Sequence, residues 1–301
     1  MITALLVSVL VLSLPPMMLR EQPAKETEAQ VCTTVSVRHT NEESYSDMDV
    51  KELALYETMA QIAFDAPKEA VKAQAVACYT LLCYQQENGG KVESTCLPFP
   101  SGYTADYWKT SLGSDYDTAM NAYRSAFAEV NGKRILYDDQ PIMALSHTVN
   151  GGMTENGEVV LGQPLPYLQS VASPADAASP AMSRTVTVSL AEASDRLTTL
   201  LGGAPPADAA TWFGQPEKTQ AGTVKSVPVC GQPQSGYAVQ KVFSLPSASF
   251  DVAVQGDLLA FTVRGQGHLV GMSTCGATAM ATDGQTYEQI LKHYYTGVTL
   301  E

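Results

Sequence analysis

The sequence predicts a mixed α+β fold for this chain of 301 residues. Residues 70–83 contain no helix-breaking residue and carry apolar side chains at helical spacing. From Arg184 onward, short stretches alternate between apolar and polar residues, which is typical of strands. Because 45% of the residues are hydrophobic, the chain can bury one large core or two smaller ones.

An apolar run, ITALLVSVLVLSL, covers residues 2–14 and ends at Pro15 and Pro16. It is shorter than the ~20 residues of a full membrane span, so it favours a signal peptide or short anchor over residues 1–20. A core strand is the alternative interpretation. Residues 21–46 are polar and predict a linker that carries a folded domain, residues 47–301, away from the membrane. We therefore expect an extracytoplasmic protein.

The strongest helix signal follows this linker. Pro67 is typical of a first helical turn, Val71, Cys78 and Leu82 recur at helical spacing, and a glycine pair at 89–90 predicts the end. Taken alone, this pattern indicates a tightly packed core helix. The other predicted helices cover about 47–62, 115–130, 191–201, 277–281 and 286–295. Strands are predicted within 134–145, at 186–190, 223–229 and 237–243, so 184–262 is a strand-rich middle segment.

Charge and cysteine content limit the partners. The net charge is −13, from 31 acidic and 18 basic residues, which argues against nucleic acid as a partner because phosphate contacts need clustered Lys and Arg. Six cysteines, at positions 32, 78, 83, 96, 230 and 275, are permissible outside the cytoplasm. They fit either disulfides or free thiols, and the spacing does not decide their pairing.

The string KEAVKAQAVA, residues 68–77, resembles the signature of the stage II sporulation protein D family. These are lytic transglycosylases of bacterial spore formation, and the family includes the amidase enhancers. Lys72, Gln74 and Ala75 match its usual spelling. The position of the family's catalytic glutamate falls on Gln61, and the arginine of the motif falls on Tyr79.

Two later phrases resemble the same family. In 144–168, His147, the glycine pair 151–152, the run Thr154-Glu155-Asn156 and the run 166–168 match, while Asn150 replaces a serine. The glycines permit close backbone approach to a ligand, and the hydroxyls of Thr154 and Tyr167 are able to hold sugar oxygens. The alternative is a glycine-rich turn with ordinary capping hydroxyls.

The phrase at 265–277 matches at His268, at Gly271-Met272-Ser273 and at Gly276-Ala277. His268 then binds substrate or orients a neighbour, and a hydrogen-bonded structural histidine is the alternative. The matching phrases extend over about 53–300. The resemblance implies a two-lobed domain around a substrate groove and substrate-binding roles for Lys72, His147, Asn150, Thr154, Tyr167 and His268.

The implied substrate is a peptidoglycan glycan strand stripped of stem peptides by a partner amidase of the stage II sporulation protein P type. A single glutamic acid protonates the oxygen that joins N-acetylmuramic acid to N-acetylglucosamine. It then acts as base while the muramic C6 hydroxyl attacks, which gives a 1,6-anhydro end. The resemblance implies no cofactor. Some members bind zinc in the loop after the Ala-rich helix, but here only Cys96 falls there and no histidine lies between Cys78 and Cys96, so we predict no metal.

Gln61 is unable to perform this chemistry, because an amide has no proton to release at useful pH. Glu57 and Asp65 lie one helical turn away and are candidate substitutes. Two main functions therefore stay open: a weak or inactive lytic transglycosylase that binds and remodels glycan strands, and a non-catalytic wall-binding module that recruits or enhances an N-acetylmuramoyl-L-alanine amidase. A plain secreted sugar-binding protein is a third alternative. The two main functions both require Gln61, Thr154, Tyr167 and His268 to converge on one cleft.

Overall fold

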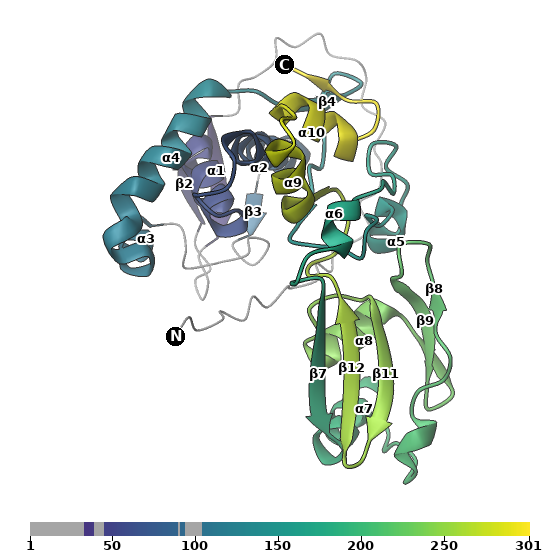
Figure 1. Cartoon of the computed structure of the whole chain (residues 1–301). Helices are drawn as coiled ribbons and strands as arrows, with labels where there is room; N and C mark the ends of the chain where they lie inside the picture. The colour runs from purple at the N-terminus through teal and green to yellow at the C-terminus, as the bar shows by residue number, and fades with distance from the viewer. Residues whose placement is uncertain (1–32, 39–44, 90, 94–103) are drawn as a thin grey trace.

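The computed structural model describes residues 33–38, 45–89, 91–93 and 104–301. Helices and short sheets are both present, which confirms the predicted mixed α+β class. Two lobes are visible in Figure 1: a large, mainly helical lobe that contains both ends of the described chain, and a small lobe built around three antiparallel strands. The large-lobe core takes residues from 55–168 and again from 270–298, so the small lobe is an insertion between them.

The Ala-rich helix α2 (Lys68–Gly89) is the centre of the large lobe. Its residues 70–80 are all buried, and it packs against α1 (Val50–Gln61), α4 (Tyr116–Glu129), α9 (Thr274–Thr282) and α10 (Tyr287–Tyr294). Alanines at 70, 73, 75 and 77 permit this close contact on several sides at once. The other elements of the large lobe are β1 (Thr34–Arg38), β2 (Tyr45–Asp49), β3 (Lys91–Glu93), α3 (Ala105–Leu112), η2 (Gly113–Asp115), β4 (Ile135–Tyr137), β5 (Gln140–Pro141), β6 (Ser146–His147), α5 (Gly157–Leu161), α6 (Pro174–Ala177), β13 (Met272–Ser273) and β14 (Thr299–Leu300).

The structure confirms the predicted Ala-rich helix. It starts directly after Pro67 and ends at Gly89, as the proline and the glycine pair predict. The helix expected from about Asp47 begins at Val50 instead, because Asp47 and Met48 belong to β2. Asp49 is its N-cap and accepts hydrogen bonds from two backbone N–H groups of the first turn.

Part of the predicted linker forms a strand, which corrects the sequence prediction. Residues 34–38 form β1, which pairs with β2 in an antiparallel ladder and with β3 in parallel. Val35 and Val37 alternate inward and are buried with Leu82 and Cys83 of α2. The polar composition of 21–46 hides this strand because only one of its faces is apolar. Residues 45–46 of the predicted linker begin β2, while residues 1–32, which include the apolar run, and residues 39–44 lie outside the described residues.

The small lobe has its own core. Its main sheet has the order β11-β12-β7, with β12 (Leu258–Arg264) between β7 (Ser183–Ser189) and β11 (Phe250–Gln255). Phe243 of α8 (Gly236–Phe243) and Phe250 of β11 both pack on Phe261 of β12, and α7 (Leu190–Leu201) contributes Ala193 and Leu197 to the same core. The remaining elements are η3 (Ala209–Thr211), β8 (Glu217–Lys218), β9 (Val224–Val229) and β10 (Gln232–Gln234).

The strand predicted at 237–243 is wrong, because these residues form helix α8. Val239 and Phe243 are four residues apart and both fully buried, so their contacts follow helical spacing. Ser235 accepts a hydrogen bond from the Ala238 N–H at 3.1 Å and caps the helix. A stretch this short fits both the helix and the strand period of apolar residues, and the N-cap residue Ser235 is the signal that distinguishes the two.

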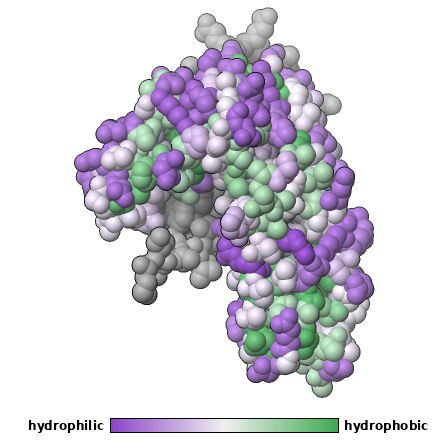
Figure 2. All heavy atoms as spheres, viewed as in Figure 1, coloured by the Kyte–Doolittle hydropathy of each residue, from purple (hydrophilic) through white to green (hydrophobic). Residues whose placement is uncertain are grey.

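The surface has regions of both kinds of hydropathy. Figure 2 shows hydrophilic residues over the upper part of the large lobe, with hydrophobic areas among them, and hydrophobic residues toward the free end of the small lobe. Val254 and Leu258, beside the turn between β11 and β12, are among the exposed large apolar residues. In the described part of the chain, no helix combines the length and hydropathy that crossing a membrane requires.

Candidate functional site

Gln61 stands at the C-terminal end of α1, and its amide is held from both sides. The Ser146 hydroxyl donates to Gln61 Oε1 at 2.7 Å, and Gln74 Nε2 donates to the same oxygen at 3.0 Å. Gln61 Nε2 donates to Glu57 Oε2 at 3.2 Å and lies 3.7 Å from Cys78 Sγ. We call Glu57, Gln61, Gln74, Cys78 and Ser146 the Gln61 cluster.

Helical spacing explains how this cluster forms. Glu57 and Gln61 share one face of α1 at a spacing of four residues, and Gln74 and Cys78 share one face of α2 at the same spacing. Packing α1 against α2 therefore brings four polar side chains to one point, and Ser146 of β6 completes it. Gln61 and Ser146 are half-buried while the other three are buried, so a ligand from solvent meets Gln61 and Ser146 first.

The side chains of the Gln61 cluster form hydrogen bonds, but its amides and its thiol do not transfer protons near neutral pH. Burial raises the pKa of Cys78 to about 12, with a further contribution from the charge of Glu57, so the thiol stays protonated at neutral pH. Gln61 has no titratable proton. Gln74 Oε1 is a buried acceptor without a hydrogen-bond partner among the described residues, which is uncommon outside functional sites.

Two histidines lie next to the cluster. Their ring centroids are 6.1 Å apart, and the ring of His268 is hydrogen-bonded to the backbone of Ser146. His147 Nδ1 lies 3.1 Å from the Val270 carbonyl, so that nitrogen carries the proton. His268 Nδ1 instead accepts from the Val270 N–H at 3.1 Å, which places its proton on the other nitrogen. The two neutral rings are thus fixed in opposite tautomers by one residue.

Burial keeps both rings uncharged. It lowers the pKa of His147 to about 3, with a smaller contribution from His268, and it lowers the pKa of His268 to about 4. Near neutral pH neither histidine is protonated, so the pair offers hydrogen-bond donors and acceptors without a charge. Such a surface suits an uncharged polar ligand better than an anionic one.

The glycine-rich loop after His147 supports this ring. Asn150 Nδ2 lies 3.1 Å from His147 Nε2, and the Asn150 N–H donates to Asp176 Oδ1 at 3.0 Å. Gly152 has a φ of +108°, and a Cβ there would lie 3.2 Å from the Cβ of Ala177. The positive φ expected from the glycine pair is therefore present, and it serves the close packing of this loop on α6.

Thr154 and Tyr167 bond to residues outside the Gln61 cluster. Thr154 is fully buried, and its hydroxyl accepts a hydrogen bond from the Val171 N–H at 2.9 Å. The Tyr167 hydroxyl accepts from the Met143 N–H at 3.2 Å, and its ring packs on Tyr137. No hydrogen bond or ring contact among the described residues joins either hydroxyl to Gln61, whereas Gln61 and His268 both contact Ser146.

Lys72, on α2, contacts residues outside the Gln61 cluster. Its Nζ lies 2.6 Å from Glu69 Oε1, 3.3 Å from Glu129 Oε2 and 4.7 Å from the centre of the Tyr287 ring. These contacts tie α2 to α4 and α10. Asp65, the other candidate acid, is exposed in the turn between α1 and α2. Tyr79, a departure from the family spelling, is buried and lines a cavity that Gln61 does not line.

The Gln61 and histidine groups lie where the two lobes meet. The Tyr237 hydroxyl of α8 donates to the His268 carbonyl at 3.3 Å. Glu155, which is almost fully buried, accepts from the Thr219 hydroxyl at 2.6 Å and from the Asn156 N–H at 2.8 Å. The middle residue of the matching run 154–156 therefore joins the lobes.

Sequence reasoning missed three residues of this region. Ser146 links the Gln61 amide to the histidine pair, and its only sequence signal is its place beside His147. Gln74 matched the family spelling without being assigned a role. Glu155 matched as well, and its partner Thr219 lies 64 residues further along the chain, beyond any local pattern.

Comparison with known proteins places this architecture in a family. No family model matches the chain. It is 30% identical over 279 residues to stage II sporulation protein D of Bacillus subtilis (strain 168), which covers 89% of this chain and 78% of that protein. It is also 30% identical over 285 residues to stage II sporulation protein D of Bacillus amyloliquefaciens, covering 92% of this chain and 81% of that protein. The chain therefore belongs to the stage II sporulation protein D family.

The amidase enhancer of Bacillus subtilis (strain 168) is a more distant relative. It is 26% identical over 286 residues, which cover 77% of this chain and 38% of that longer protein. The motif residues indicate the same family as the similarity over most of the chain. Together these names support a cell-wall-related role in sporulation.

Proposed function

We propose that this chain is a cell-wall protein of sporulation that binds peptidoglycan glycan strands without cleaving them. Membership of the stage II sporulation protein D family and the similarity to an amidase enhancer support the wall-related part. The observation that carries the rest is the amide of Gln61. Where the family spelling has its catalytic glutamate, this chain has a neutral group fixed by Ser146, Gln74 and Glu57.

The proposed binding surface is the half-buried rim of Gln61, Ser146 and His268. Amide, hydroxyl and neutral imidazole groups are suited to the hydroxyl and acetamido groups of a glycan. A glycan stripped of its peptides carries one lactyl carboxylate on each N-acetylmuramic acid, and its remaining polar groups are the hydroxyl and acetamido groups that this rim matches. The remaining predicted residues position this rim or the fold around it: Lys72, His147, Asn150, Thr154 and Tyr167.

The absence of cleavage follows from proton chemistry. The family reaction needs one group that first donates and then accepts a proton, and an amide does neither at useful pH. A general acid commonly contributes a factor of 10²–10⁴ in rate. Losing it leaves residual turnover at most.

A relocated acid is the second candidate, and one observation favours it. Glu57 lies within hydrogen-bond reach of Gln61, so a carboxyl group is present one turn from the family position. It is buried, and a turn of helix is ~5.4 Å along the axis. Glu57 therefore has to move toward the rim before it protonates a glycosidic oxygen, and a weak lytic transglycosylase would result.

The proposal also includes a partner and a location. A chain that holds stem-free glycan without cutting it would act by recruiting or enhancing the N-acetylmuramoyl-L-alanine amidase that exposes such strands, of the stage II sporulation protein P type. The substrate lies outside the cytoplasm, so the chain would act there, held at the membrane or secreted through its apolar N-terminal run.

The test is to incubate the purified full chain with stem-free glycan strands and to measure both retention on the glycan and anhydro-muramic products. We expect retention without product. Gln61→Glu places a second carboxyl group beside Glu57, and two carboxyls at this distance share a proton, which raises the pKa of one of them. This variant is expected to gain product at least 100-fold over background.

The variants separate the two candidates. Product from the unmodified chain that disappears in Glu57→Gln would establish the relocated acid. Absence of glycan retention in the unmodified chain would refute the binding function itself. Thr185→Val, an exposed change on the small lobe, is the matched control and leaves both readouts unchanged.

A further inference from the structure

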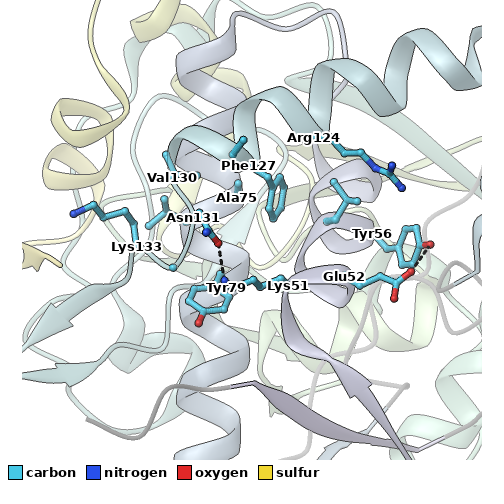
Figure 3. Close-up of a pocket in the computed structure, with 14 residues that line it drawn as sticks. Lys51, Glu52, Tyr56, Ala75, Tyr79, Arg124, Phe127, Val130, Asn131 and Lys133 are labelled. Carbon is cyan, nitrogen blue, oxygen red and sulfur yellow. Dashed lines mark hydrogen bonds between the residues drawn. The ribbon is translucent and has the colours of Figure 1, made fainter. Parts of the chain in front are cut away.

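Helices α1, α2 and α4, with residues 130–133 after α4, line an open cavity of about 360 Å³ (Figure 3). This volume lies within the ~300–1,000 Å³ of pockets that take ligands. Its walls are mainly apolar and include Leu55, Val76, Tyr79 and Phe127. No residue of the Gln61 cluster lines the cavity.

The charged residues around this cavity are unusual for the molecule. Lys51, Arg124 and Lys133 line it against a single carboxylate, Glu52, which accepts a hydrogen bond from the Tyr56 hydroxyl at 3.1 Å. The whole chain carries a net charge of −13, so this is a local positive region on an acidic protein. Figure 3 shows Lys133 on one side, Arg124 on the other and the Phe127 ring between them.

We propose that this cavity binds a partner protein through a short acidic segment that carries one large apolar side chain. The apolar side chain would enter between Phe127 and Tyr79, and flanking carboxylates would meet Arg124 and Lys133. A ligand of this cavity has to contact both kinds of group. The cations at the rim attract anions, whereas the apolar side chains of the floor offer few hydrogen-bond partners.

Other ligands fit this combination poorly. A glycan strand needs hydrogen-bonding walls for its many hydroxyl groups, and here most lining side chains are apolar. Nucleic acids and anionic membranes need extended cationic surfaces, whereas three cations stand here on a molecule of opposite net charge. The inference goes beyond the proposed glycan function and rests on a different surface, so either can fail without the other.

The probe is a labelled peptide with leucine between two pairs of aspartates, capped at both ends, together with phenylalanine and tryptophan versions. Fluorescence anisotropy with the full chain at low salt reports binding. We expect at least one of the three to bind ten or more times tighter than the serine-centred peptide and the lysine-flanked peptide. Raising ionic strength to 0.5 M should weaken binding severalfold, because screening shortens the range of the charges.

Variants locate the site. Arg124→Glu is expected to weaken binding at least tenfold, and the matched control Lys241→Glu, an exposed cation on α8, less than twofold. Ala128→Trp fills the cavity from an exposed position on α4 without changing charge, and it should also weaken peptide binding tenfold while glycan retention is unchanged. Circular dichroism confirms that each variant is folded.

Three results would overturn the proposal. The first is that none of the acidic apolar peptides binds better than the serine-centred control. The second is equal weakening by Arg124→Glu and Lys241→Glu, which indicates a general charge effect. The third is binding to anionic lipid vesicles in preference to every peptide.

Discussion

At the scale of single residues, the histidine pair shows how burial fixes a chemical state. Val270 donates its N–H to one ring and offers its carbonyl to the other, so both tautomers are set by one backbone unit. Charging His147 would place its new N–H against Asn150 Nδ2, and charging His268 would place its new N–H against the Val270 N–H. Either change would also leave a buried cation. The pair is therefore a neutral part of the site, and this neutrality makes stability depend on pH.

The first prediction concerns that dependence. The folded-state pKa of His147, about 3, lies below its unfolded value of ~6.5. The stabilising effect is complete above pH 6.5 and is lost as the pH falls toward 3, because the unfolded chain binds a proton that the folded one excludes. Each such histidine gives a slope of about 1.4 kcal/mol per pH unit in this window.

Urea unfolding of His147→Gln between pH 4 and 6.5 measures this contribution. The variant is expected to show a slope lower by about 1.4 kcal/mol per pH unit than the unmodified chain. Thr148→Ala, a change at the exposed neighbouring side chain, keeps the original slope. Equal slopes for His147→Gln and the unmodified chain would contradict a neutral buried His147.

At the scale of elements, α9 packs on α10 and α6 through a glycine. A Cβ at Gly276 would lie 2.0 Å from the Tyr294 hydroxyl, 2.5 Å from Ser173 Oγ and 2.8 Å from Asp176 Oδ2. These three side chains form a buried hydrogen-bonded group, which also receives the Ser273 hydroxyl at 2.5 Å. Close packing around residue 276 therefore explains why this matching position holds a glycine.

Gly276→Ala is the second prediction. The added methyl has to displace buried, hydrogen-bonded side chains, so the variant should lose about 1–3 kcal/mol of unfolding free energy. Gly203→Ala is the matched control, since nothing lies within 4 Å of a Cβ there. Chemical denaturation of both variants measures the difference, and equal stabilities would show that the group around Asp176 yields easily.

Sequence reasoning succeeded where one local pattern dominates an element. The Ala-rich run of α2 has a start signal, a period and a stop signal, and its limits are close to the prediction. It failed at α8 and β1, whose apolar residues are too few to fix a period. For the site, the phrases located Gln61 and His268, but the buried positions of Thr154 and Tyr167 depend on contacts between distant segments.

At the scale of the whole molecule, the contacts between the two lobes affect the geometry of the site. The large lobe supplies Gln61, and the segment that returns from the small lobe supplies His268. Thr219 and Tyr237 of the small lobe bond to Glu155 and to the His268 carbonyl. The relative position of the two site halves therefore depends on a few polar contacts between the lobes.

Thr219→Val is the third prediction. The change removes a hydroxyl that donates to Glu155 Oε2 at 2.6 Å and leaves that side of a buried carboxylate without its donor. We expect a loss of about 1–3 kcal/mol in unfolding free energy. Because the contacts between the lobes also position His268, glycan retention should weaken at the same time. Thr185→Val, exposed on β7, is the matched control for both measurements. A stable Thr219→Val protein with full glycan retention would show that the hydrogen bond between Thr219 and Glu155 does not set the geometry of the site.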